Sequence, residues 1–139
     1  MKRSALVLLC ATAVSCQQQQ EATRLSGSYA GALQGRQGVA SVSVRLDEAQ
    51  GALSGTAQAS GLTFVSGRTY YAVGTRNGDD VDLTIRAGWE TESQAFGFIE
   101  GECIYVLSGQ ASSSRLHGSY STLGTCPQPD QGTFDLQRQ

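Results

Sequence analysis

From Leu25 onward, apolar and polar residues alternate along most of the chain. The segment 40–47 has an apolar residue at every even position and a polar residue at every odd one, and the pattern recurs at 81–87, 115–121 and 133–137. Strict alternation places one face of a strand in a core and the other in water. It is typical of antiparallel sheets, because parallel strands are buried on both faces. The pattern therefore predicts an all-β domain.

Turn-forming residues separate the alternating segments. Asn77-Gly78 is the strongest hairpin signal, because both residues tolerate the positive φ angles of a type I′ turn. Gln50-Gly51, Glu100-Gly101 and 112–114 predict further reversals. The predicted strands lie near 28–34, 39–47, 52–59, 62–76 (in one piece or broken at Gly67), 80–87, 94–100, 102–110, 115–122 and 132–138. We therefore expect a single antiparallel meander of about eight to nine strands closing into a small barrel, with a β-sandwich as the alternative.

A five-residue pattern of apolar, polar, glycine, polar and aromatic residues occurs at 25–29 and again at 116–120. Glycine at such points lets a strand coil strongly or accommodates a bulge. The pattern resembles those found in small exported barrels such as the avidin family, and this resemblance implies a barrel fold. It does not extend to biotin binding, because that family binds biotin with several Trp and this chain has only Trp89.

Residues 1–15 have the composition of an export signal. Met1-Lys2-Arg3 is positively charged, and the apolar stretch from Leu6 to about Val14 is too short to cross a bilayer. Ala13-Val14-Ser15-Cys16 resembles the lipobox of bacterial lipoproteins, in which the Cys is acylated and becomes the first residue. Ala11-Thr12-Ala13 fits the alternative, which is cleavage by ordinary signal peptidase and secretion.

The parity of the cysteines favours the lipoprotein interpretation. Cleavage before Cys16 removes one Cys with the leader and leaves Cys103 and Cys126 as an even pair, which we expect to form a disulfide. A cysteine-based metal site has no nearby Cys or His partners in the sequence.

The polar segment that follows fits the same interpretation. Residues 16–24 form a Gln-rich tether ahead of a β-barrel-like domain at 25–139. In lipoproteins, a residue other than Asp after the acylated Cys implies the outer membrane, and Gln17 stands there. We therefore expect a protein anchored by lipid in the cell envelope, at the outer membrane and facing the periplasm or the surface.

Charge and motifs exclude several classes. The net charge of −2 and the absence of a basic patch argue against nucleic-acid binding. The sole histidine, His117, shares a predicted polar face with Arg115 and Ser119, and no Gly-x-Ser-x-Gly motif is present. The cluster of Asp79, Asp80 and Asp82 is expected to form a charged hairpin tip. We therefore assign no catalytic residue, metal or cofactor.

Two further carboxylates, Glu100 and Glu102, flank Gly101 and are expected to be exposed turn residues rather than a glycosidase-like pair.

The segment 94–109 departs from one-sided alternation, because it carries apolar residues on both faces. If Glu100-Gly101 is a two-residue turn, one face joins the core, and the other needs cover from the Cys126 loop, a partner or a ligand. The adjacent Tyr70 and Tyr71 must point to opposite faces. The candidate partner or ligand surface comprises Tyr70, Tyr71, Phe96, Phe98, Tyr105 and Leu107.

These features predict a non-enzymatic β-barrel module that binds an envelope protein or a small apolar ligand. An envelope inhibitor of a lytic enzyme is the alternative. Ala59-Ser60-Gly61 resembles a short stretch of membrane-bound lysozyme inhibitors, whereas Leu62-Thr63-Phe64 departs from their basic and aromatic continuation. A hydrolase is the third class.

Overall fold

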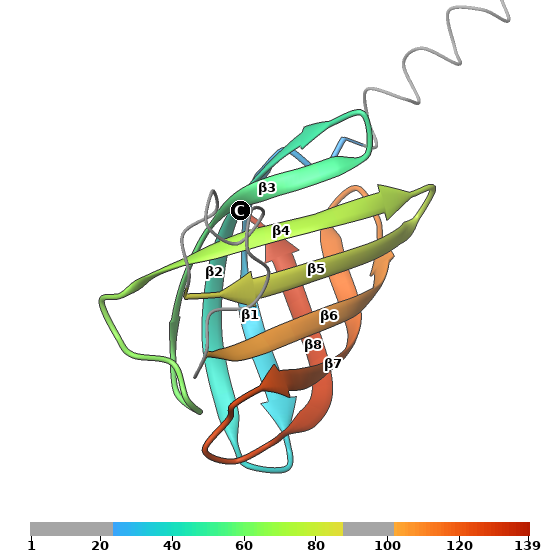
Figure 1. Ribbon diagram of the computed structural model, residues 1–139. Helices are drawn as coiled ribbons and strands as arrows, with labels where there is room; N and C mark the ends of the chain where they lie inside the picture. The colour runs from blue at the N-terminus through green and yellow to red at the C-terminus, as the bar shows by residue number, and fades with distance from the viewer. Residues whose placement is uncertain (1–23, 88–101) are drawn as a thin grey trace, which may run out of the picture.

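The computed structural model describes residues 24–87 and 102–139, and these form a closed barrel of eight antiparallel strands (Figure 1). The strands are β1 (Gly27–Gly35), β2 (Val39–Ala49), β3 (Ala52–Ser60), β4 (Thr69–Asn77), β5 (Asp80–Arg86), β6 (Cys103–Ala111), β7 (Arg115–Gly124) and β8 (Gln131–Arg138). Each strand pairs with the next, and β8 closes the ring by pairing with β1, with Gly31 opposite Leu136. The prediction of a meander barrel is confirmed, and the sandwich alternative is wrong.

Two predicted elements differ from the structure. The strand expected at 62–76 begins only at Thr69, because residues 61–68 leave the sheet, with Leu62 at φ 51° and Gly67 at φ 84°. The strand expected at 94–100 lies outside the described residues. Both edges of β6 are paired, one with β5 and one with β7.

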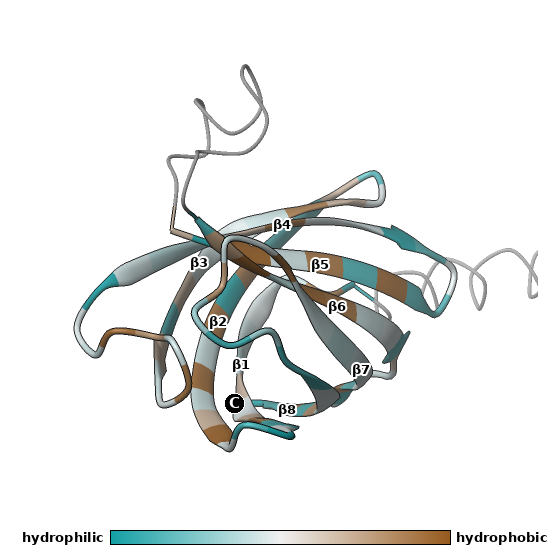
Figure 2. Cartoon of the chain, turned by 60° about the horizontal axis from the view of Figure 1, so that its bottom comes forward, coloured by the Kyte–Doolittle hydropathy of each residue, from teal (hydrophilic) through white to brown (hydrophobic). Residues whose placement is uncertain are grey.

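The core fills the inside of the barrel. Along β2, buried Ala40, Val42, Val44 and Leu46 alternate with exposed residues, as the sequence pattern predicts. Figure 2 shows the same alternation of apolar and polar bands along strands such as β5. The larger inward side chains come from every part of the ring and include Tyr29, Leu33, Leu53, Leu83, Ile85, Leu107, Leu116, Tyr120, Phe134 and Leu136.

Glycines on the inner face allow neighbouring strands to approach closely. A Cβ on Gly31 would lie 1.9 Å from the carbonyl oxygen of Asp135, and one on Gly74 would lie 2.0 Å from that of Asp82. Four more inward glycines lie within 2.3 Å of a neighbouring carbonyl by the same measure, namely Gly55, Gly109, Gly118 and Gly132. A small barrel needs such points, where its strands coil strongly.

The two ends of the barrel are built differently. At the end that we call the closed end, residues 50–51, 78–79 and 112–114 make short turns, and the described chain begins at Arg24 and ends at Gln139. At the opposite end, the mouth, residues 36–38, 61–68 and 125–130 connect the strands. Figure 1 shows the β1–β2 turn and the β7–β8 connection together at the bottom of the view. Within the described residues, no helix has the length and apolarity needed to cross a membrane.

Candidate binding site at the mouth of the barrel

A buried carboxylate joins two connections at the mouth. Asp130 is 7% exposed, and its Oδ1 accepts hydrogen bonds from the backbone N–H groups of Arg36 (2.9 Å), Gln37 (3.2 Å) and Gln131 (2.9 Å). Its Oδ2 accepts a hydrogen bond from the Tyr120 hydroxyl at 2.7 Å. Four donors therefore satisfy this carboxylate, and they tie the β1–β2 turn to the β7–β8 connection.

This arrangement shifts the ionisation of both side chains. Burial by itself would raise the pKa of Asp130, but the hydrogen bonds from Tyr120, Gln131, Gln37 and Arg36 outweigh it and hold the pKa below 3.8. Burial raises the pKa of Tyr120 far above 10.0, and the hydrogen bond to Asp130 and its negative charge add to this. Asp130 is therefore a charged, structural acceptor over a wide pH range.

The close approach of these groups requires a glycine on β1. A Cβ on Gly35 would lie 2.0 Å from the Tyr120 hydroxyl oxygen and 2.2 Å from Asp130 Oδ2. Any larger side chain would therefore displace the carboxylate from its donors.

An aromatic side chain from the β3–β4 connection closes the mouth from inside. Phe64 is buried and stacks on Tyr105 with 4.3 Å between ring centroids, and its ring meets Tyr70 edge-on at 5.0 Å. The Tyr70 hydroxyl accepts the Val65 N–H at 2.8 Å, and the hydroxyls of Thr63 and Tyr105 share a short hydrogen bond. The connection is therefore fixed by its own side chains. Figure 2 shows its apolar stretch.

The disulfide between Cys103 and Cys126 is present, as the sequence predicts. It joins the start of β6 to the β7–β8 connection, two positions before Tyr105 on β6. Thr63 Oγ1 also lies 3.9 Å from Cys103 Sγ. The disulfide therefore stands between the two connections that border the mouth.

A groove of about 560 Å³ opens between these connections. Its lining comprises Gln37, Leu62, Thr63, Tyr105, Pro127, Gln128 and Asp130. The volume falls in the range of small-molecule sites, which is roughly 300–1,000 Å³. Three chain segments thus build a concave surface over the buried Tyr105.

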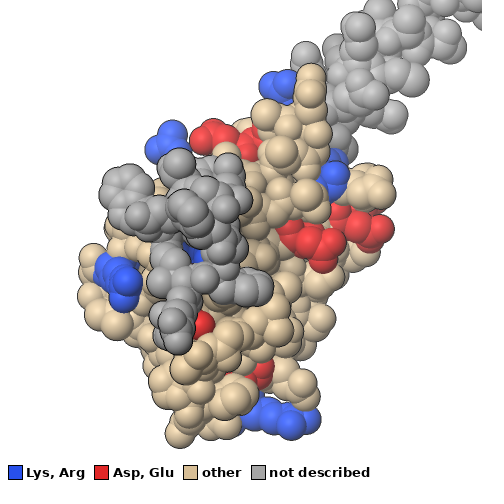
Figure 3. All heavy atoms as spheres, viewed as in Figure 1, with Lys and Arg blue, Asp and Glu red and all other residues tan. Residues whose placement is uncertain are grey.

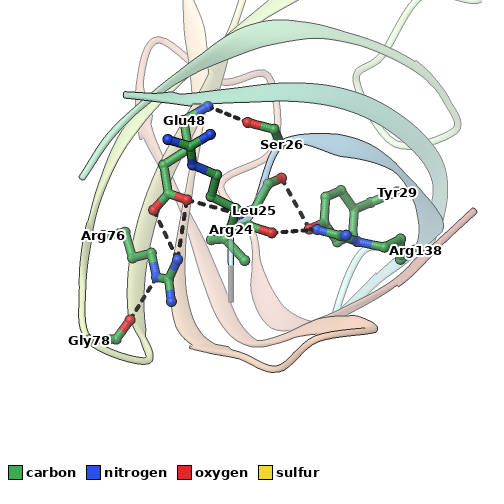
Figure 4. A network of polar contacts seen from close by, with 8 residues as sticks. All are labelled: Arg24, Leu25, Ser26, Tyr29, Glu48, Arg76, Gly78 and Arg138. Carbon is green, nitrogen blue, oxygen red and sulfur yellow. Dashed lines mark hydrogen bonds and ion pairs between the residues drawn. The ribbon is translucent and has the colours of Figure 1, made fainter. Parts of the chain in front are cut away.

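The closed end is held by charges rather than by aromatic stacking (Figure 4). Glu48 forms an ion pair with Arg76 at 3.0 Å and accepts the Leu25 N–H at 2.9 Å. Tyr29 donates its hydroxyl to the Leu25 carbonyl at 3.1 Å and accepts a hydrogen bond from Arg138 at 2.8 Å. Leu25 is 1% exposed, so the first described residues seal this end.

The described residues of the predicted partner surface do not lie on one face of the barrel. Tyr70 and Tyr71 point to opposite faces, as expected, with Tyr70 buried and Tyr71 half-buried on the outside. Tyr105 and Leu107 both point inward and are 2% and 1% exposed. They pack in the core, and of the two only Tyr105 lines the groove. Phe96, Phe98 and Trp89 lie outside the described residues.

The other chemistry-bearing residues lie on the outer wall. His117 is exposed and pairs across the strands with Asp135, whose carboxylate binds Arg115 at 2.7 Å. That ion pair lowers the pKa of Asp135. Asp82 accepts a hydrogen bond from Ser108 at 2.8 Å. Within the part of the chain that the structure describes, no three His, Cys, Asp or Glu side chains gather as a metal site would require.

The expectation that Glu102 is an exposed turn residue is wrong. Glu102 is 9% exposed and forms an ion pair with the buried Arg86 at 3.1 Å. Glu100 lies outside the described residues.

Charged groups are distributed unevenly between the two ends. Figure 3 shows acidic side chains gathered on the right of the view, where the β4–β5 hairpin ends. Among the described residues of the mouth, the exposed charged side chains are Arg36 and Arg68, whereas Asp130 and Glu102 are buried.

No protein-family model, no curated protein and no solved structure matches this chain. The site therefore has to be interpreted from its own geometry. Sequence reasoning did not identify Asp130, Phe64, Leu62 or Gln37 as members of a site. The available signals were weak: an apolar Leu62–Phe64 stretch beside Gly61, and a Pro-flanked segment ending in an acid at 127–130.

Proposed function

We propose that this chain is an exported lipoprotein, anchored in the cell envelope through acylated Cys16, that binds a protein partner with the mouth end of its barrel. The module works by binding rather than by catalysis. The membrane of attachment is the outer membrane, in keeping with Gln17 after the acylated Cys.

One observation carries the proposal: the described chain begins at the end of the barrel opposite the groove. The Arg24 carbonyl is held by Arg138 at 2.6 Å, and Leu25 is buried just beyond it. Residues 16–23 reach at most roughly 29 Å when extended. A lipid on Cys16 would therefore keep the closed end near the membrane and direct the mouth away from it.

The surface chemistry of the mouth supports a protein partner. The three large apolar side chains most exposed in the described residues are Val39 (57%), Val65 (57%) and Leu123 (49%). Val39 begins β2, Val65 lies in the β3–β4 connection, and Leu123 lies near the end of β7, so all three lie at the mouth end. The end of the barrel that carries the groove therefore also carries these exposed apolar side chains, which supports a partner bound at this end.

A small apolar ligand inside the barrel fits less well. Phe64 closes the mouth, and the inward side chains, from Tyr29 to Leu136, pack in one buried cluster. The groove outside Phe64 is lined by amides and hydroxyls as well as apolar groups. A partner with its own hydrogen-bonding groups suits this lining better than a hydrocarbon does.

Site-specific crosslinking in the native envelope tests the proposal. A photoreactive residue at Leu123 should capture one defined protein, and the same group at Asp79, on the closed end, should not capture it. Identical products from both positions, or none from Leu123, would overturn the binding proposal. If the captured protein is a lytic enzyme, added purified chain should inhibit it, which would identify the alternative function.

Metabolic labelling with palmitate tests the anchor separately. The wild-type chain should carry the label, and a Cys16→Ala variant should not. A label that persists in the variant would show that Cys16 is not the acylated residue.

A further inference from the structure

The residues that line the groove at the mouth indicate the chemical class of its ligand. We infer that it binds an extended, uncharged segment of a protein partner, with an apolar side chain of that segment between Leu62 and Pro127 and its peptide groups held by the carboxamides of Gln37 and Gln128. This inference rests on the proposed function and assigns the recognition site within it.

The lining selects against charged ligands. Among the described residues that line it, Asp130 is the only carboxylate, and four donors already occupy it. A cation would have to compete with these donors, and the described part of the lining contains no Lys or Arg to receive an anion. Electrostatic complementarity between the groove and its ligand therefore favours a neutral ligand.

The polar groups that remain suit peptide bonds. Gln37 and Gln128 are exposed, and their side chains form no hydrogen bond with another described residue. Each carboxamide offers both donors and an acceptor, which matches the N–H and C=O of a peptide unit. Recognition through a sheet edge is excluded in the described barrel, because every strand is paired on both sides.

A sugar ring fits less well than a peptide. Sugars commonly stack on an exposed aromatic face, but Tyr105, the only aromatic residue among the described residues of the lining, is 2% exposed. Phe64 already stacks on its ring at 4.3 Å. Tyr105 therefore forms the floor of the groove and offers no stacking platform.

The apolar walls are held in place before any ligand binds. Leu62 is half-buried and adopts φ 51°, a left-handed conformation that a Leu rarely adopts. Its neighbours Thr63 and Phe64 are fixed to Tyr105 by a hydrogen bond and by stacking. Pro127 follows directly after Cys126, which the disulfide holds. A preformed groove loses little freedom on binding.

The left-handed conformation of Leu62 allows a substitution that tests binding separately from stability. Leu62→Gly removes one apolar wall and also relieves the backbone, since Gly adopts this conformation without steric cost. Leu62 also packs against the buried core, so the loss of that contact offsets the relief of the backbone. The variant should therefore bind poorly while its melting temperature changes little. Gln50→Gly is the matched control, because Gln50 has nearly the same φ, 52°, in the β2–β3 turn at the closed end.

Selection from a phage-displayed library of random heptapeptides, with the disulfide-bonded full chain as the target, tests the inference. Enriched peptides should be uncharged, with one apolar position in common. Synthetic capped copies should bind Leu62→Gly and Gln128→Ala about ten-fold or more weakly, as expected for loss of an anchor contact, and should bind Gln50→Gly as the wild type. The absence of enrichment, a charged consensus, or binding that Leu62→Gly leaves unchanged would overturn the inference.

The crosslinking experiment separates this inference from the proposed function. If Leu62→Gly abolishes the product formed from Leu123, the groove recognises the partner. If the product persists, the mouth still binds a partner but the groove does not, and only the inference fails.

Discussion

The two ends of this barrel close the same sheet by different physical means. The closed end uses two-residue or three-residue turns, a buried Leu25 and charged groups that satisfy one another, with Glu48 between Arg76 and the Leu25 N–H. The mouth has two longer connections, at 61–68 and 125–130, which a disulfide, aromatic stacking and the buried Asp130 carboxylate hold in place. It leaves a groove and exposed apolar side chains. The closed end therefore does what folding requires. The groove and the exposed apolar side chains of the mouth do not contribute to folding, so a function is expected there.

The largest effect should come from the seal of the closed end. Leu25→Ala should lower the free energy of unfolding by about 3 kcal/mol, because it removes a fully buried side chain and leaves a cavity. Chemical denaturation measures the change. Leu123→Ala, at 49% exposure on the mouth end, is the control and should change stability little. An equal loss in both variants would contradict the contrast between the ends.

The disulfide should have a comparable but more local effect. Replacing both Cys103 and Cys126 by Ser should destabilise the chain by about 3 kcal/mol in the chain-entropy model. Amide hydrogen exchange should rise first in residues 124–131 and remain slow at Leu25 and Tyr29. If exchange rises equally at both ends, the disulfide supports the whole barrel rather than the mouth.

The buried carboxylate should make the stability of the mouth depend on pH. Because the pKa of Asp130 is lowered on folding, its contribution is present above the ordinary value of 3.8 and is lost as the pH falls through the lower folded pKa. Asp130→Asn should cost about 2 kcal/mol at neutral pH, the value of hydrogen bonds to a charged group. Its stability should then fall less steeply in acid.

Asp130→Asn should also change the ionisation of Tyr120 at alkaline pH. The raised pKa of Tyr120 stabilises the fold below pH 10.0, and this contribution is lost as the pH rises through the folded pKa. In Asp130→Asn, a tyrosine absorbance titration should show Tyr120 ionising at a lower pH than in the wild type. An unchanged titration would mean that burial alone sets the pKa of Tyr120.

The smallest effect is expected on the outer wall between the ends. The ion pair of Arg115 with Asp135 is exposed, and solvent screens such pairs strongly. Arg115→Ala should therefore leave the melting temperature unchanged within error. A marked drop would show that the wall contributes to stability as the closed end does.

Much of the fold could be predicted from local rules. The hairpin signal at Asn77-Gly78 marks the β4–β5 reversal, although the turn lies one residue later, at 78–79, and Asn77 ends β4 opposite Asp80. Residues Ala40 to Leu46 alternate toward the core, and Cys103 is bonded to Cys126. The prediction failed for Glu102, which sequence reasoning placed in an exposed turn and the fold pairs with Arg86. It also failed for 62–68, because these residues form a connection instead of a strand and Phe64 packs on Tyr105 inside the mouth.

The candidate site could hardly be predicted at all. Gln37, Thr63 and Asp130 come from three connections and carry no common motif, and they form one groove only because the barrel brings its ends together. The lowered pKa of Asp130 likewise depends on N–H groups 93 and 94 positions away in the chain.

By itself, the sequence determined most of the strands and their inward faces, the reversals at the closed end and the pairing of the two cysteines, because each depends on neighbours in the chain or on simple parity. Only the tertiary structure decided which end is sealed, that Phe64 packs inside the mouth, and that Leu62 and Pro127 line one groove. The reason is physical: alternation specifies which side of a strand is buried, whereas the shape of the mouth depends on packing between connections far apart in the chain.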